Sequence, residues 1–163
     1  MKETKWLEEN QKIVTLLKKI SIFKAFDDED FQGLLKISKL HFYRPGEFII
    51  MEGSTETFIY FLIRGTVKIT KNKKTITTLR RRGDIFGEMG VVEIAPRSAA
   101  AYATEDTVCL ATDFMSIKRI SGKEKLSLGY LFYRIISEIL VNRLKTTTDE
   151  LMKYVDKKGL KSD

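Results

Sequence analysis

The chain has 163 residues, of which 43% are hydrophobic and 31% are charged, and this balance is typical of one folded domain with a helical extension. Its formal net charge is +7, but the basic residues form only small clusters, as at Lys71–Lys74 and Arg80–Arg82, so we do not expect a nucleic-acid partner. No apolar run approaches the ~18 residues of a membrane span, and Met1–Gln11 lacks a signal peptide's apolar stretch, so we expect a cytoplasmic protein without a membrane partner.

Residues 1–39 are predicted to form the N-terminal helices. From about Lys5 to Ile20, apolar residues recur near the helical period, and Trp6 is expected to anchor this first helix. Asp27 has the position of an N-cap, because three acidic residues follow it where a helix dipole favours negative charge. The apolar face of this second helix contains Phe31, Leu34 and Leu35.

Residues 40–113 are rich in β-branched and aromatic residues, and glycines interrupt them at short intervals. Short runs of this kind with regular turn signals predict an all-β sandwich or barrel. The lone cysteine, Cys109, lies in an apolar run and is expected to be a core residue; the single histidine, His41, has no partners for a metal site. The expected strands are Phe48–Met51, Phe58–Ile63, Val67–Thr70, Thr75–Leu79 and the stretch Ala99–Ala111, with a hairpin tip at Lys71–Lys74.

Residues 114–163 return to a helical pattern. Phe114–Ile120 predicts a short helix, and about Lys125–Val155 predicts a long one with an apolar stripe at steps of three, four or seven residues. The stripe can pair with a second copy as a coiled coil or pack against the chain's own β-region, and we favour a homodimer through this helix. The stripe contains Leu128, Phe132, Ile136, Leu140, Leu144, Leu151 and Val155.

The stretch Phe86–Ala99 carries the most informative chemistry. It places one acid, Glu88, and one arginine, Arg97, around a glycine-containing turn. A cyclic phosphodiester bears one negative charge, and a guanidinium can donate to two of its oxygens in parallel. A ribose hydroxyl can donate to an ionised carboxylate, while backbone N–H groups in a glycine turn add neutral donors. The alternative is a Glu88–Arg97 salt bridge that only fixes a loop.

Phe86–Ala99 resembles the phosphate-binding cassette of cyclic-nucleotide-binding domains. This module occurs in catabolite-activator-type regulators, protein-kinase regulatory subunits and nucleotide-gated channels. The resemblance covers roughly Ile20 to Arg143. It extends to Arg44–Glu47, Glu52–Gly53, Leu62–Val67 and Gly83–Glu88.

The resemblance implies a mainly β fold with flanking α-helices. Its centre would be a double-stranded β-helix, a jelly-roll-like β-roll, between N-terminal helices and a long C-terminal helix. We therefore divide the chain into residues 1–39, a β-roll at 40–113 that contains the cassette (86–99), and C-terminal helices at 114–163.

The resemblance also implies a role for each cassette residue. Arg97 would bind the cyclic phosphate, and Glu88 would accept a hydrogen bond from the ribose 2′-hydroxyl. A hydroxyl at Ser98 can bond the phosphate or a guanine amino group, so both cAMP and cGMP stay open, although we favour cAMP. Four residues would line the ligand, three through backbone amides and the last by packing its side chain: Gly87, Ser98, Ala99 and Met89.

The long C-terminal helix is expected to recognise the base. Asn142–Thr148 resembles the stretch in which catabolite activators place polar residues near the adenine amino group. Thr147 and Thr148 are the candidates here, and Arg143 is a candidate stacking partner. The alternative is that these threonines are exposed or bond back to their own helix.

We expect neither an enzyme nor a metal protein, since the chain lacks a P-loop, a G-x-G-x-x-G run and an H-E-x-x-H helix. The leading hypothesis is a sensor in which the nucleotide shifts the helix arrangement and so signals to an unidentified effector protein. One alternative is a catabolite-activator-type transcription regulator. Only about eight residues follow Val155, too few for a DNA-binding domain, so such a regulator would lack this domain or be truncated before it. The other is an interaction module with a vestigial pocket.

Overall fold

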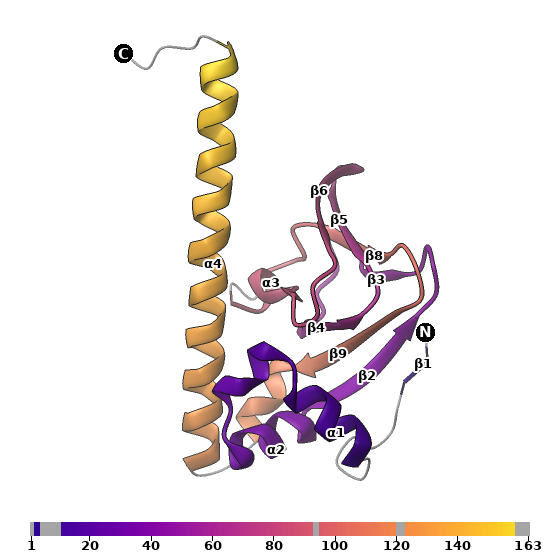
Figure 1. The fold of residues 1–163 in the computed structure, drawn as a ribbon, viewed down its shortest axis with the longest axis vertical. Helices are drawn as coiled ribbons and strands as arrows, with labels where there is room; N and C mark the ends of the chain where they lie inside the picture. The colour runs from indigo at the N-terminus through magenta and orange to yellow at the C-terminus, as the bar shows by residue number, and fades with distance from the viewer. Residues whose placement is uncertain (1, 4–10, 93–94, 120–122, 159–163) are drawn as a thin grey trace. The chain divides into compact units, whose positions relative to one another are not determined.

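A computed structural model of the chain describes residues 2–3, 11–92, 95–119 and 123–158 (Figure 1). The contacts divide the chain into two compact units, Met1–Gly129 and Tyr130–Asp163. The first unit contains all the described strands and the N-terminal helices, and the second is formed by most of the long C-terminal helix. Trp6 and the predicted start of the first helix lie outside the described residues.

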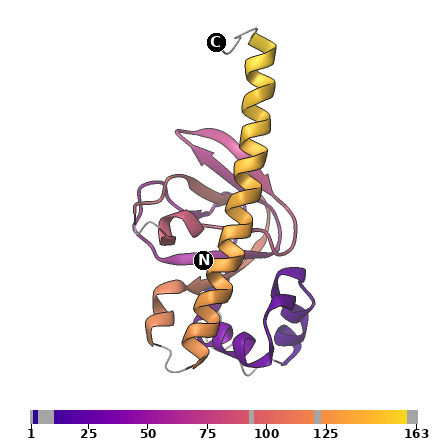
Figure 2. The same ribbon diagram turned by 90° about the vertical axis from the view of Figure 1, so that its left-hand side faces the viewer.

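Two short α-helices and a 3-10 turn precede the sheets. They are α1 (Gln11–Lys18), η1 (Ser21–Ala25) and α2 (Asp28–Lys36), and the two views show α1 beside α2 (Figures 1 and 2). The carboxylate of Asp27 accepts a hydrogen bond from the backbone N–H of Asp30 at 2.8 Å. The N-cap predicted at Asp27 is therefore confirmed.

The β-region forms two antiparallel sheets. The five-stranded sheet has the order β1-β2-β9-β4-β7, and the four-stranded sheet has the order β3-β8-β5-β6. A mainly β fold with flanking helices is thus confirmed. The strands are β1 (Lys2–Glu3), β2 (Ser38–Tyr43), β3 (Phe48–Ile50), β4 (Phe58–Arg64), β5 (Val67–Lys71), β6 (Lys74–Leu79), β7 (Ile85–Phe86), β8 (Ala100–Ala103) and β9 (Thr107–Asp113).

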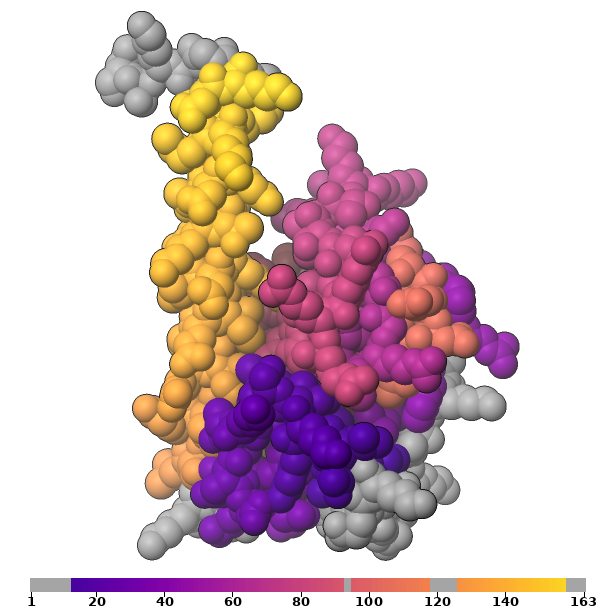
Figure 3. Space-filling model, in the orientation of Figure 1, coloured from indigo at the N-terminus to yellow at the C-terminus, as the bar shows by residue number. Residues whose placement is uncertain are grey.

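The β5–β6 hairpin has a tighter tip than the sequence indicated. Lys71 pairs with Lys74, so only Asn72 and Lys73 form the turn. Both have positive φ angles, 49° and 64°, as a two-residue type I′ turn requires. This hairpin projects from the surface of the first unit, where its basic side chains are exposed (Figure 3).

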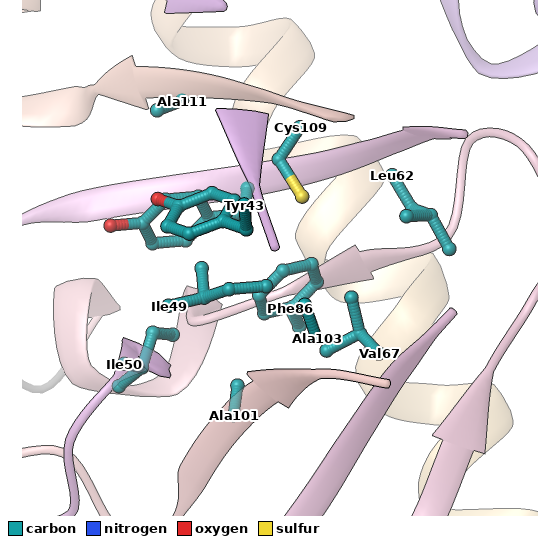
Figure 4. Close-up of a cluster of buried hydrophobic side chains, with 11 residues drawn as sticks. Tyr43, Ile49, Ile50, Leu62, Val67, Phe86, Ala101, Ala103, Cys109 and Ala111 are labelled. Atoms are coloured by element: carbon teal, nitrogen blue, oxygen red, sulfur yellow. The ribbon is translucent and has the colours of Figure 1, made fainter. Parts of the chain in front are cut away.

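Alternation along the strands gives the five-stranded sheet two buried faces. One face lies in the interior of the roll, where Tyr43, Phe86 and Cys109 share an apolar cluster with residues of the other sheet (Figure 4). The opposite face packs against the N-terminal helices, as the 5.1 Å separation between the ring centroids of Phe23 and Phe61 indicates. Cys109 is a free and fully buried core residue, as predicted.

Two helical segments follow β9: the 3-10 helix η2 (Phe114–Arg119) and α4 (Lys123–Lys158). Within the first unit, the start of α4 packs so closely on α2 that a Cβ atom at Gly33 would lie 2.6 Å from Leu128 Cδ1. Along the predicted stripe, Leu128 and Phe132 are buried, whereas Leu144 and Leu151 are exposed. No helix among the described residues is long and apolar enough to cross a membrane.

Candidate functional site

The turn between β7 and the short helix α3 (Glu88–Val92) depends on Gly87. Its φ angle is +83°, a conformation that L side chains rarely adopt. A Cβ atom at this position would also lie 3.1 Å from both the Nη1 atom of Arg97 and the carbonyl oxygen of Phe58. Gly87 therefore permits the backbone to approach the Arg97 side chain closely.

A second glycine packs on the same arginine. A Cβ atom at Gly90 would lie 3.0 Å from Arg97 Cδ and 3.1 Å from Arg97 Nη1. The α3 helix thus lies directly on the Arg97 side chain, and the glycine spacing of the cassette creates the space for it.

The Arg97 guanidinium is held by backbone carbonyls. Nη1 donates to the carbonyl oxygen of Gly87, and Nη2 donates to that of Phe58 at 2.6 Å. These two carbonyls lie just beyond Tyr60 and Phe86, which pair across β4 and β7. Arg97 therefore joins the two strands at the point where their own pairing ends.

The backbone of Arg97 is fixed as well. Its N–H donates to the carbonyl oxygen of Ser54 and its carbonyl accepts from the N–H of Gly53, both at 2.8 Å. The loop after β3 and the cassette are thereby joined on both sides of one residue. This arrangement leaves the arginine little freedom and so orients it before any ligand arrives.

Arg97 is buried, with only 3% of its surface exposed. Burial lowers the pKa of its guanidinium, and the electrostatic influence of Tyr60, Glu56 and Glu88 acts in the opposite direction. An arginine nevertheless stays protonated in proteins. Its buried Nε atom makes no hydrogen bond with the described residues.

Glu88 is the first residue of α3 and is completely buried. It follows Gly87 directly, and its charge acts on the Arg97 guanidinium. The structure thus brings together Gly87, Glu88 and Arg97. Of the other predicted cassette residues, Met89 and Ser98 are exposed and Ala99 is half-buried.

The three candidates for base recognition lie on α4, in the second unit. Thr147 and Thr148 are exposed, and Arg143 is half-buried. The neighbouring Thr146 donates its hydroxyl to the carbonyl oxygen of Asn142 at 3.0 Å. Back-bonding to the helix, the alternative considered for this run of threonines, thus occurs at Thr146.

Sequence reasoning did not identify Phe58 or Ser54 and noted Gly53 only as part of a turn, although all three hold Arg97 in place. They act through backbone atoms, and no side-chain pattern indicates which carbonyl an arginine will reach. Gly90 carried a detectable signal, because a glycine inside a short helix often marks a close approach. The described residues include no group of three or more side chains arranged to hold a metal ion.

Comparisons with known proteins agree on one family. The family model described as "Cyclic nucleotide-binding domain" matches residues 40–122. A cGMP-dependent protein kinase of Toxoplasma gondii is 36% identical over 95 residues, which are 58% of this chain and 10% of that protein. The chain therefore spans only about a tenth of the length of this curated relative.

Two solved structures share the fold. One, described as "Sp-2Cl-cAMPS bound to PKAR CBD2", is 27% identical with a TM-score of 0.62, and the match covers 90% of this chain and 89% of that one. The other, the catabolite activator protein of Thermus thermophilus, is 25% identical with a TM-score of 0.65, covering 82% of this chain and 62% of that one. The predicted β-roll with flanking helices is thus confirmed.

Proposed function

Because the chain belongs to the cyclic nucleotide-binding domain family, we propose that it is a sensor that binds a cyclic nucleoside monophosphate, cAMP in preference to cGMP. The observation that carries the proposal is the state of Arg97. It is a buried cation held by neutral carbonyl dipoles, and its buried Nε–H donor makes no hydrogen bond with the described residues.

A cyclic phosphate can supply the hydrogen-bond acceptor that the Nε–H of Arg97 does not find among the described residues. A buried charge is costly unless it is paired, and a phosphodiester supplies one negative charge and two anionic oxygens. The Nε edge of a guanidinium can donate to such oxygens in parallel. In this proposal, the backbone amides of Gly87, Ser98 and Ala99 add neutral donors around the same phosphate and ribose.

Glu88 is proposed to bind the ribose. Its buried carboxylate begins α3 directly after Gly87, and a ribose 2′-hydroxyl would supply a hydrogen-bond donor for it. Met89 follows with an exposed side chain that can pack on the nucleotide. These roles follow the family resemblance position by position.

The proposed preference for cAMP over cGMP depends on the residues that would contact the base. The T. gondii kinase is named as cGMP-dependent, whereas the PKAR structure holds a cAMP analogue, so relatives of both kinds are similar to this chain. Ser98 is compatible with either base. We favour cAMP because the hydroxyls of Thr147 and Thr148 can bond an adenine amino group, with Arg143 as the proposed stacking partner.

The proposed output is a population shift of the helices in a cytoplasmic protein. In the proposed division into N-terminal helices (1–39), β-roll (40–113) and C-terminal helices (114–163), the roll binds the phosphate and ribose, and α4 recognises the base and relays the signal. The exposed residues Leu144 and Leu151, on the predicted stripe, support a homodimer through α4. An effector protein would distinguish the two helix arrangements.

Calorimetry of the whole chain tests the proposal. We expect saturable binding of cAMP, weaker binding of cGMP and no comparable binding of 5′-AMP, whose phosphate is not cyclic. Failure of both cyclic nucleotides to bind at high micromolar concentration would contradict the proposed function. Tighter binding of cGMP would contradict only the base preference.

A further inference from the structure

Three polar side chains lie in a row on the inner face of the five-stranded sheet, near the Arg97 site. The Nδ1 atom of His41 lies 3.1 Å from the hydroxyl oxygen of Tyr43, and Tyr43 shares a side-chain hydrogen bond with Tyr60. All three residues are buried. They come from β2 and β4, the two strands that flank β9 in the five-stranded sheet.

The Nδ1 atom of His41 and the Tyr43 hydroxyl can each act as donor or acceptor, according to the tautomer of the histidine, so the pair stays hydrogen-bonded in either case. Burial raises the pKa of both tyrosines, and both stay neutral.

The ring of Tyr60 contacts both segments that hold Arg97. It stacks on Phe86 with centroids 5.2 Å apart and an interplanar angle of 14°. Phe86 directly precedes Gly87, whose carbonyl accepts from Arg97 Nη1. The same ring lies 6.2 Å from that of Phe58, whose carbonyl accepts from Nη2.

We propose that Tyr60 is a positioning residue for Arg97. Its ring packs against the Phe58 and Phe86–Gly87 segments, and the hydrogen bond of its hydroxyl with Tyr43 keeps the ring in the orientation that sets the separation of the two carbonyls. Tyr43 and His41 are therefore part of the same support, at the far end from the arginine.

The neutrality of this support has a consequence for binding. A carboxylate in the place of Tyr60 would pair with the guanidinium and compete with an incoming anion. The two carbonyls that hold the guanidinium are neutral, so they orient the cation while leaving its charge for a ligand. The effect on affinity rests on the proposed function, but the positioning of Arg97 does not.

The first test uses the ligand-free protein. In the ¹H–¹⁵N spectrum, the Arg97 Nε–H signal is identified by its loss in Arg97→Lys. We expect Tyr60→Phe to shift this signal and accelerate its exchange with solvent. The control Tyr102→Phe, on a half-buried tyrosine that packs with Phe48 on the other sheet, should leave it unchanged. An unchanged signal in Tyr60→Phe would overturn the proposal.

The second test measures coupling by calorimetry with cAMP. Where Arg97 is present, Tyr60→Phe should weaken cAMP binding by about five-fold. In the Arg97→Lys background, the same substitution should weaken it by less than about two-fold. Equal losses in the two backgrounds would mean that Tyr60 has a general structural role, and would overturn the proposal. If the wild type binds no cyclic nucleotide, the proposed function fails while the spectrum still decides the positioning role. Tyr60→Phe keeps the ring, so the fold is expected to persist.

Discussion

The Nη2 atom of Arg97 donates to the carbonyl oxygen of Phe58 at 2.6 Å, a bond between residues 39 positions apart. It connects the cassette to the first residue of β4. A phosphate at the Nε edge can use the second N–H of Nη2 while this bond is kept, so a shift of the guanidinium on binding reaches Phe58. Nucleotide binding is therefore expected to act on the start of β4 as well as on α3.

Gly87 should be needed for both conformation and space. Gly87→Ala introduces a side chain at φ +83° and places Cβ 3.1 Å from Phe58 O and Arg97 Nη1, so we expect lower stability and weaker cAMP binding. Gly46→Ala is the matched control, because Gly46 has φ +85° with nothing within 4 Å of the added Cβ. The control should lose about 1–2 kcal/mol in urea unfolding from strain alone and keep its affinity for cAMP. Equal affinities in the two variants would contradict this account of Gly87.

Gly33 should set how closely α2 approaches Leu128, which lies at the start of α4 in the same unit. Gly33→Ala would place Cβ 2.6 Å from Leu128 Cδ1, and we expect this overpacking to cost about 1–3 kcal/mol in thermal or urea unfolding. Gly129→Ala, also within a helix but with nothing within 4 Å, should instead stabilise the protein by about 0.5–1 kcal/mol. Shortening the opposing side chain with Leu128→Ala should make Gly33→Ala less costly in the double variant. Additive losses would argue against a direct contact.

Glu88 should make the protein bind nucleotides with a ribose 2′-hydroxyl more tightly than nucleotides without it. In the wild type, 2′-deoxy-cAMP should bind about ten-fold more weakly than cAMP, because a hydrogen bond to a charged group contributes about 1.5–3 kcal/mol. Glu88→Gln should weaken cAMP binding and reduce this difference between the two nucleotides. Competition calorimetry measures both values. A Glu88→Gln protein that still discriminates as the wild type does would exclude this role.

Cys109 should make stability depend on pH in the alkaline range. Burial raises the pKa of its thiol from 9.0 to about 12, so its contribution is present below pH 9 and is lost as pH rises towards 12. Between pH 8 and pH 10, the free energy of unfolding should fall by about 1 kcal/mol more in the wild type than in Cys109→Ala. Tyrosine ionisation in the unfolded chain is centred at about pH 10 and is the same in both proteins, so it cancels in this comparison. Identical slopes for the two proteins would contradict the assignment.

How well each feature could be predicted depends on how far apart in the sequence its interacting residues lie. The Asp27 N-cap was predictable because its acceptor and donor are three residues apart. The apolar stripe of α4 could be predicted from its spacing. The burial of Leu128 and the exposure of Leu144 could not, because the spacing does not show which part of the stripe other residues cover. The residues Glu88 and Arg97 were identified by the motif, whereas the Phe58 carbonyl was not. Backbone acceptors carry no residue-type signal.

The most direct test compares cAMP binding to the wild type, Arg97→Ala and Arg80→Ala by calorimetry. Arg80 is an exposed arginine outside the cassette, so its variant changes the net charge equally and controls for long-range electrostatics. Because Arg97 is proposed to hold the cyclic phosphate, Arg97→Ala should cost at least about 2 kcal/mol, a loss of about thirty-fold or more in affinity, while Arg80→Ala stays near the wild type. A wild type that binds cAMP no better than Arg97→Ala would show that Arg97 does not hold the cyclic phosphate.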